Sequence, residues 1–384
     1  MNPEIIKLRK ELHQNPELSG NEYETVNRIK EFITSHHPTH FIENIGNNGL
    51  AAVYTFPKPG TTITIRCELD ALPIEEENEF DHRSQNEGVS HKCGHDGHMA
   101  IVAGLVFWIK KQKFKSGKIV LLFQPAEETG KGAFEILSDQ KFKQLNSDYI
   151  FALHNIPGAP LHSIITMKKG FSAEVVSFVI HLTGKKSHAA QPENGINPAL
   201  VISDLIKEFS TLNVTEPLSD DFAILTPVHI TMGEKAYGIS PAMGELHYTI
   251  RTWNTERMDL LKKQLQKIVK TKCMLHNLTY TIDWFEYFPA SQNDHDCNKM
   301  IYTVAKENNF KIIQRPYPFR FGEDFGWFAK HYKTAMFGLG SGVNSPALHH
   351  SNYDFPDEII ETGIKMFTSL IEKTIHSETH NTSS

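Results

Sequence analysis

The chain has 384 residues, 40% of them hydrophobic and 22% charged, which excludes a disordered, collagen-like or disulfide-scaffold protein. Its formal net charge of −6 gives no overall attraction to nucleic acid or anionic lipid, and no apolar stretch approaches the ~20 residues of a membrane span. The N-terminus has no signal-peptide core and four cysteines do not suggest a disulfide framework, so we expect a cytoplasmic globular protein with free thiols and no nucleic-acid or membrane partner.

Residues 1–168 alternate between strand and helix patterns. Apolar residues at helical spacing predict two helices within residues 4–35, separated at Asn15-Pro16. Strands are expected over residues 51–56, 61–67, 119–123 and 149–153, and helices over residues 97–112 and from residue 133. The run 119–123 is continuously apolar, which is typical of a strand buried on both faces of a parallel sheet. The alternation predicts an α/β fold with a largely parallel sheet flanked by helices.

Residues 171–290 follow a different pattern. Strands are expected over 173–182, 224–232, 245–252 and 278–287, and helices from Asn197-Pro198 to about 212 and over 256–270. The order β-α-β-β-α-β is that of a ferredoxin-like unit. We therefore predict a domain at 171–290 that is inserted into a first domain made of residues 1–170 and 291–384. The last segment should add helices at 300–308, 324–330 and 357–376 and a strand at 334–339, with a polar tail that frays after Ile375.

Polar side chains follow the predicted strands of the first domain repeatedly. They are Asp70, the pair Glu127-Glu128, His154, and the pair His349-His350. Because ligands bind past the carboxyl ends of the strands in open α/β sheets, this shared placement predicts a functional site at that edge.

Cys93-Gly94-His95 leads directly into a predicted helix. A Cys and a His two residues apart, with Gly between them, can turn a thiolate and an imidazole toward one point, and both are good Zn²⁺ ligands. One alternative is a tight turn that caps the helix, with Asp96 as the N-cap residue. The other is a Cys93 nucleophile with a His base, for which the sequence offers no convincing third member.

The adjacent carboxylates of Glu127 and Glu128 point to different sides of an extended loop and can therefore take two different roles. One can bind a metal while the other holds the attacking water and accepts its proton. The alternative is a solvated acidic loop or the first turn of a helix. His154, His349 and His350 have a comparable alternative, as core or surface histidines.

One thiolate, three imidazoles and a carboxylate make a donor set that suits two metals with a shared ligand better than one structural tetrahedral site. The mixture of S, N and O donors favours Zn²⁺, with Mn²⁺, Co²⁺ or Ni²⁺ as alternatives. In the inserted domain, His188 is either an exposed loop residue or a group that projects into the cleft.

On these residues the chain resembles metal-dependent amidohydrolases of the aminoacylase/carboxypeptidase superfamily. It is most similar to the branch of hippurate hydrolase, N-acetyl-diaminopimelate deacetylase and the plant indole-acetyl-amino-acid hydrolases. The matching segments run nearly the whole length and are Leu8-Arg9 to Leu12-His13 with Pro16-Glu17, Asp70-Ala71-Leu72-Pro73, Cys93-Gly94-His95-Asp96-Gly97-His98, Gln124-Pro125-Ala126-Glu127-Glu128, Ala152-Leu153-His154, Ser187-His188-Ala189-Ala190 with Gly195 to Pro198, Gly322-Glu323-Asp324-Phe325, and Leu348-His349-His350. The segments at residues 93–98 and 124–128 are together highly specific.

The resemblance implies a role for each matching residue. Cys93 would bridge two divalent metals as a thiolate. The outer ligands would be His95, Glu128, His154 and His349. Glu127 would be the general base, and Asp70 would orient a ligating His. His188 would reach across a homodimer, formed through the inserted lid domain, to hold the oxyanion of the tetrahedral intermediate; the role of His350 is left open.

Three positions depart from the family pattern. Glu68 stands where the wider superfamily has a metal-binding His, as expected of this branch, in which His95 takes over. Gly238 replaces an Asn that the branch often has near the substrate, and Gly322 replaces a common Ser. The loss of the Asn side chain affects the expectation for substrate recognition more than that for catalysis.

The sequence thus predicts a two-domain, metal-dependent amidohydrolase that cleaves the amide of an N-acyl amino acid, with Glu127 moving the proton. The first alternative is a dipeptidase or carboxypeptidase with the same cleft, which needs a free terminus on its substrate. The second is a metal-binding protein that does not catalyse. The third is the Cys93 nucleophile, whose activity would survive chelation.

Overall fold

The protein divides into two compact units in a computed structural model that describes residues 2–168 and 170–381. The first unit consists of Met1–Phe171, Ser291–Pro316 and Asp324–Ser384. The second consists of Ser172–Ala290 and Tyr317–Glu323. The short segment Tyr317–Glu323 was not expected in the second unit from the sequence pattern.

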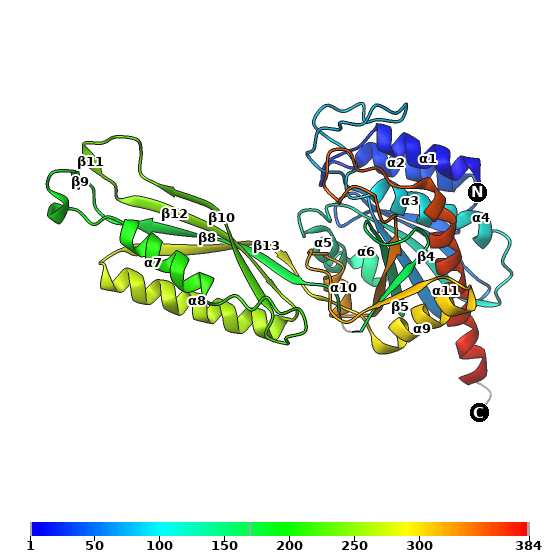
Figure 1. The fold of residues 1–384 in the computed structure, drawn as a ribbon. Helices are drawn as coiled ribbons and strands as arrows, with labels where there is room; N and C mark the ends of the chain where they lie inside the picture. Colours follow the sequence, from blue (N-terminus) through cyan, green and yellow to red (C-terminus); the bar gives the residue numbers. More distant parts are fainter. Residues whose placement is uncertain (1, 169, 382–384) are drawn as a thin grey trace. The chain divides into compact units, whose positions relative to one another are not determined.

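An eight-stranded mixed sheet forms the centre of the first unit (Figure 1). Its strands are β1 (His40–Ile45), β2 (Gly49–Thr55), β3 (Lys58–Glu68), β4 (Ser116–Gln124), β5 (Tyr149–Ile156), β6 (Ile164–Met167), β15 (Ile312–Arg315) and β16 (Lys333–Gly340). They lie in the order β1-β2-β4-β3-β5-β16-β6-β15. The run from β4 through β3 and β5 to β16 is parallel throughout, as is β6 with β15. The prediction of an α/β fold with a largely parallel central sheet is confirmed.

Strand β4 shows why the sequence forms a two-sided core. Ile119, Leu121 and Phe123 pack in the main hydrophobic cluster, whereas the alternating residues Val120 and Leu122 lie outside it and are equally buried. Since successive side chains of a strand point to opposite faces, the strand is covered on both sides, as its continuous apolar run predicted.

Helices complete the first unit. They are α1 (Pro3–Gln14), α2 (Tyr23–Thr34), α3 (His95–Gly104), α4 (Val106–Ile109), α5 (Gly132–Ser138), α6 (Gln140–Lys143), α9 (His295–Glu307), α10 (Gly326–Ala329) and α11 (Ile360–Asn381). α3 and α11 pack against β3 and against each other, and α1 packs on α3. The single helix expected over 97–112 is divided at Leu105. α11 continues to Asn381, beyond the point at which fraying was expected, and the tail residues 382–384 lie outside the described part of the chain.

The second unit has a four-stranded antiparallel sheet in the order β10-β12-β8-β13. The strands are β8 (Glu174–Thr183), β10 (Ala223–Met232), β12 (Met243–Thr252) and β13 (Thr279–Phe288), and Figure 1 shows α7 (Ala199–Ser210) and α8 (Thr255–Leu275) along one face. This chain order and sheet order are those of the expected ferredoxin-like unit. Two short pairs, β9 (Ser187–His188) with β11 (Ile239–Ser240) and β7 (Gly170–Ser172) with β14 (Ser291–Gln292), were not expected.

None of the described helices combines the length and the apolar character that crossing a membrane requires.

Candidate metal centre

Three of the expected site segments follow neighbouring strands. Asp70 comes two residues after β3 ends, Glu127 and Glu128 follow β4, and His154 lies near the end of β5. β4, β3 and β5 are adjacent and parallel, so their carboxyl ends meet at one edge of the sheet. These residues therefore lie at the edge of the sheet that the sequence suggested, at or past the carboxyl ends of the strands, where open α/β sheets bind ligands.

The loop before α3 brings Cys93 and His95 to the same edge. Gly94 lies between them with φ +91°, in the left-handed region that favours glycine. A Cβ at this position would lie 2.7 Å from the side chain of Asn155. Helix α3 begins at His95, and Gly94 is the N-cap residue, so the alternative with Asp96 as the cap is wrong.

The donor atoms of six residues gather in overlapping groups. Within each group all the donor atoms lie within 4.8 Å of one another, and the groups are Cys93 with His95 and His154, Cys93 with Glu128 and His349, and His95 with Glu127 and Glu128. The Cys93 Sγ lies 3.5 Å from His154 Nε2, and Glu128 Oε2 lies 3.8 Å from His349 Nε2. Cys93 thus belongs to two groups at once, as a thiolate shared between two metals would.

Backbone oxygens set the orientation of the two buried imidazoles. His95 Nδ1 donates to the Asp70 carbonyl oxygen at 2.8 Å, and His154 Nδ1 donates to the Asn155 carbonyl oxygen at 2.9 Å. Since a carbonyl oxygen only accepts, Nδ1 carries the proton in both rings and Nε2 is left to face the donor set. His95 Nε2 is buried and has no hydrogen-bond partner among the described residues. An imidazole nitrogen without a hydrogen-bond partner among S, N and O donors fits a metal ion, which would take the place of its proton.

The Asp70 carboxylate also contacts the segments that carry Glu128 and His95. Its Oδ2 accepts from the Glu128 backbone amide at 2.9 Å and from Ser19 Oγ at 2.7 Å, and its Oδ1 lies 3.5 Å from His95 Nδ1. Asp70 therefore contacts the His95 ring through its backbone carbonyl and the loop after β4 through its carboxylate, and its orienting role stays a prediction.

Buried negative charge dominates the electrostatics of the site. Burial, Glu128 and Glu127 raise the pKa of the Cys93 thiol well above its usual value. Burial lowers the pKa of His154 to about 3, so this ring is neutral, as a metal ligand must be. Burial would lower the pKa of His95, but the hydrogen bond to Asp70 and the nearby Glu68 outweigh it and raise the value to about 10. The site thus needs positive charge, which bound cations would supply while stabilising the thiolate.

Glu127 lies beside the donor atoms and is also held in place. Its side chain is buried, its Oε1 accepts from the Asp324 amide at 3.3 Å, and its Oε2 lies 3.9 Å from His95 Nε2. The preceding residue, Ala126, has φ +52°, and its amide donates to Glu22 at 2.8 Å. A non-glycine residue in this left-handed conformation costs about 1 kcal/mol or more, which the surrounding bonds offset to turn the chain after β4.

Glu68 hydrogen-bonds to the scaffold, and its carboxylate also lies within 4.8 Å of donor atoms of His95 and His98. It is fully buried, it pairs with Arg66, and its Oε2 accepts from His98 Nδ1 at 2.7 Å. Burial would raise the pKa of Glu68, but Arg66 and His98 hold it well below its usual value. His98 also binds the Asn155 side chain at 2.6 Å. No local pattern in the sequence marks this support by His98 and Asn155, because it depends on contacts between separate elements.

Three of the expected positions are not members of these donor groups. His188 is in the second unit, exposed on β9, where its Nδ1 accepts from the Ala190 amide at 3.0 Å. Gly238 adjoins Ile239, which pairs with His188 across the β9–β11 pair. His350 is exposed in the loop, as is His349, and its role stays open.

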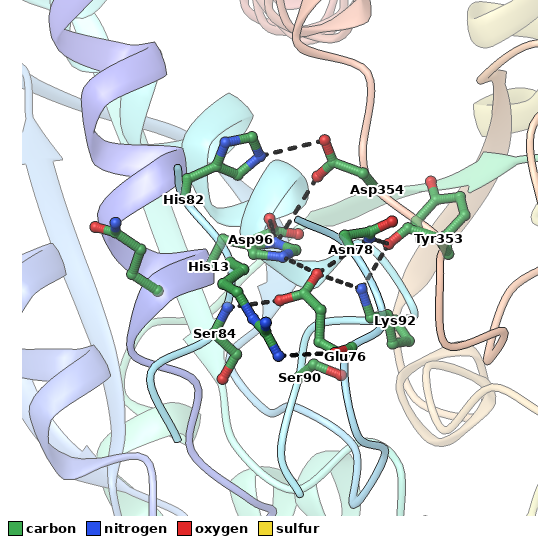
Figure 2. Close-up of polar contacts among 12 residues, drawn as sticks. His13, Glu76, Asn78, His82, Ser84, Ser90, Lys92, Asp96, Tyr353 and Asp354 are labelled. Carbon is green, nitrogen blue, oxygen red and sulfur yellow. Dashed lines mark hydrogen bonds and ion pairs between the residues drawn. The ribbon is translucent and has the colours of Figure 1, made fainter. Parts of the chain in front are cut away.

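A buried cluster of charged side chains lies in the same unit as the donor groups (Figure 2). At its centre, His13 Nδ1 donates to Asp96 Oδ2 at 2.8 Å and His13 Nε2 donates to Glu76 Oε1 at 3.0 Å. Burial would lower the pKa of His13, but Asp96 and Glu76 outweigh it and raise the value to about 9. The neighbouring His82 and His91 have lowered pKa values because burial disfavours their charged forms, so His13 is the charged ring of the three.

His13 should make the stability of the protein dependent on pH. Its pKa is raised on folding from 6.5, so protonated His13 stabilises fully below about pH 6.5, and the effect is lost as the pH rises through about 9. The free energy of unfolding of the wild type should therefore be compared with that of His13→Gln at two pH values. We expect the stability difference between the two proteins to be about 3 kcal/mol larger at pH 6 than at pH 10, in favour of the wild type. Denaturant titrations of both proteins at the two pH values measure this; a constant difference would contradict it.

Comparison with known proteins gives a consistent result. A family model described as "Peptidase family M20/M25/M40" matches residues 64–373. N-acetyldiaminopimelate deacetylase of Priestia megaterium is 30% identical over 370 residues, which cover 96% of this chain and 98% of that protein. An uncharacterized hydrolase of Staphylococcus haemolyticus is 29% identical over 374 residues, covering 93% and 94%.

Solved structures share the fold across nearly the whole chain. The YXEP protein of Bacillus subtilis, described as a dinuclear metal binding peptidase, has a TM-score of 0.83 at 24% identity over 97% of this chain and 98% of its own. A tripeptidase of Staphylococcus aureus has a TM-score of 0.75 at 16% identity over 97% and 98%.

Proposed function

The chain belongs to peptidase family M20/M25/M40 and is a metal-dependent hydrolase, and on this basis we propose that it cleaves the amide bond of N-acyl amino acids. The observation that carries the proposal is that Cys93 belongs to two donor groups at once, with the Glu127 carboxylate beside them. The 30% identity to a protein named as a deacetylase supports an N-acyl substrate.

We assign the metal ligands as in the sequence analysis. Cys93 would be shared, and the outer ligands would be His95, Glu128, His154 and His349. Two divalent ions held there would supply Lewis-acid chemistry, lowering the pKa of a water and polarising the amide carbonyl. Zn²⁺ suits the mixed donor set best, with Mn²⁺, Co²⁺ or Ni²⁺ as alternatives.

The chain's own residues would move the proton. The Glu127 carboxylate accepts a proton from the attacking water and returns it to the nitrogen of the leaving amine. Asp70 keeps His95 and Glu128 oriented during the reaction. His188 donates a hydrogen bond to the oxygen that becomes negatively charged when the carbonyl is attacked.

We further propose that His188 acts from the partner subunit of a homodimer that forms through the second unit. Strand β10 lies at the edge of its sheet and exposes Val228, Ile230 and Met232. An exposed apolar edge strand favours pairing with another chain. The reducing cytoplasm remains the expected location, and the four cysteines are free in the structure.

Hydrolysis assays test the function together with the metals. Metal content should be measured on gently purified protein, followed by hydrolysis of N-acyl amino acids, dipeptides and tripeptides that release the same amino acid, before and after chelation. We expect about two metals per chain and activity on the acyl amino acids that is lost on chelation and restored by Zn²⁺, Mn²⁺, Co²⁺ or Ni²⁺. Cleavage of the peptides alone would favour the dipeptidase or carboxypeptidase alternative. Bound metal without turnover of any substrate would favour a metal-binding protein that does not catalyse.

Subunit mixing tests the role of His188. If the residue acts across a dimer, Glu127→Ala and His188→Ala homodimers are each inactive, but each mixed dimer has one site with both native residues. Random exchange of subunits should therefore restore about a quarter of the wild-type activity. Mixed samples that stay inactive after exchange, which mass spectrometry verifies, would place His188 within its own subunit's site.

Gly238 offers a test of substrate recognition. A Cβ at this position meets no atom within 4 Å, so Gly238→Asn should fold with an unchanged Tm. We expect the added amide to lower the KM for acyl amino acids by about fivefold, because one hydrogen bond contributes about 1 kcal/mol. Steady-state kinetics measure this, and an unchanged KM would mean that this position does not contact substrate.

A further inference from the structure

Four separate segments of the first unit contribute to the buried charged cluster around His13. Arg9 and His13 come from α1, Glu76 from the loop after β3, Lys92 and Asp96 from the segment around Cys93, and Tyr353, Asp354 and Asp357 from the loop after His349. Figure 2 shows the His13, Glu76, Lys92 and Asp96 side chains turned toward one another. The side chains of His13, Lys92 and Asp96 are completely buried.

Lys92 joins two segments that carry proposed metal ligands. It immediately precedes Cys93, and its carbonyl oxygen accepts from the His349 amide at 2.8 Å. Its Nζ donates to the Tyr353 carbonyl oxygen at 2.8 Å and also binds Glu76. The backbone and the side chain of one residue therefore fasten the Cys93 segment to the His349 segment.

Asp96 makes the corresponding connection for His95, the residue that precedes it. Its Oδ2 accepts from His13 Nδ1 at 2.8 Å and from Arg9 Nη1 at 3.3 Å. Arg9 also binds Asp354 and Asp357, each at 2.8 Å. The first turn of α3 is thus fixed to α1 and to the loop that follows His349.

The cluster is not itself suited to bind a metal. Donor atoms of His13, Asp96 and Asp354 lie within 4.8 Å of one another, but the Arg9 guanidinium binds both of these carboxylates. Arg9, Lys92 and the charged His13 already offset most of the charge of Glu76, Asp96, Asp354 and Asp357. What the cluster supplies is therefore a fixed connection between segments.

We propose that Lys92 and His13 are positioning residues, which hold the segments of residues 92–96 and 349–354 together so that Cys93, His95 and His349 converge on one metal centre. This inference rests on the proposed metal ligands. Residues that orient metal ligands change metal affinity by about 10- to 100-fold when they are replaced. Since the side-chain hydrogen bonds of Lys92 and His13 go to Glu76, Asp96 and the Tyr353 carbonyl oxygen and not to the donor atoms, their effect should reach the site through ligand position.

Two variants on different segments test the proposal. Lys92→Met keeps the length of the side chain and removes its charge; because it would take away one of the two cationic partners of Glu76, it is made together with Glu76→Gln. His13→Gln alters the cluster from α1, a different segment of the chain from that of Lys92. The matched control is Glu174→Gln, a fully buried carboxylate of the second unit that accepts from Tyr287 and Thr255. It removes a comparable buried charge without touching the first unit's ligands.

Each protein is titrated with Co²⁺, and the thiolate-to-cobalt absorption band is recorded together with the Kd, kcat and KM. We expect both cluster variants to bind Co²⁺ about 10- to 100-fold more weakly, with a weakened thiolate band and a loss in kcat larger than the change in KM. The control should match the wild type in band and Kd. Folded cluster variants with the wild-type band and Kd would overturn the positioning role. A wild type without a thiolate band would instead overturn the proposed metal centre itself.

Discussion

Replacing Glu127 by Gln should leave both metals bound and lower kcat by about 10²- to 10⁴-fold, the range expected for the loss of a general base. The amide side chain retains the size of the native one and can still accept from the Asp324 amide, so the loop after β4 should keep its conformation. What it loses is the ability to take a proton from water and to return it to the leaving amine.

Metal analysis and kinetics on the same preparation separate chemistry from binding. The KM should change little, because Glu127 acts on the reacting water and not on the resting substrate. Glu135→Gln serves as the control and should behave as the wild type, because this half-buried carboxylate of α5 accepts from Asn47 at 2.7 Å and an amide oxygen can still do so. If Glu127→Gln turns over as fast as the wild type, the assignment of the general base is wrong.

Replacing Cys93 by Ala should disturb both metals at once and abolish measurable turnover. Cys93 belongs to two donor groups, so the loss of its sulfur removes a ligand from each. We expect metal content to fall from about two per chain to one or fewer under dialysis, with activity falling by at least about 10³-fold. Cys67→Ala is a close control, since this cysteine is also buried in the first unit but packs in the hydrophobic core on β3.

The same experiment decides between a metal ligand and a cysteine nucleophile. As a ligand, Cys93 should be protected from alkylation by bound metal, and activity should disappear on chelation before any alkylating reagent is added. A protein that keeps its activity after complete chelation and loses it only on alkylation would support the nucleophile.

The sequence predicted those elements whose pattern is strong over their whole length. β4 is apolar at consecutive positions, and the second unit alternates clearly, so both were recognised. β1, β6 and β15 were missed because they are short, and β1 and β15 lie at the edges of the sheet with mostly exposed or half-buried residues. Their pairing is determined by the neighbouring strand and not by a periodic pattern of their own.

Part of the donor set could be anticipated because Glu127, Glu128 and His154 lie at or just after the carboxyl ends of β4 and β5, and parallel strands end at one edge. The orientation of the ligands could not. It depends on carbonyl oxygens of Asp70 and Asn155, on the left-handed residues Gly94 and Ala126, and on a charged cluster whose members come from four segments. Such contacts join residues far apart in the chain, and no local pattern of residue types encodes them.

The position of β16 in the sheet also has a consequence for synthesis of the protein on the ribosome. β16 lies between β5 and β6, although it is made about 170 residues after them, at Lys333–Gly340. Until that strand has left the ribosome, β5 and β6 lack the partner between them, and an unpaired strand edge is prone to associate with other chains. The ferredoxin-like unit, by contrast, is almost continuous in sequence and can form its sheet as soon as β13 has emerged. The nascent chain therefore carries an incomplete first sheet through most of its synthesis, a period in which it would depend on chaperones.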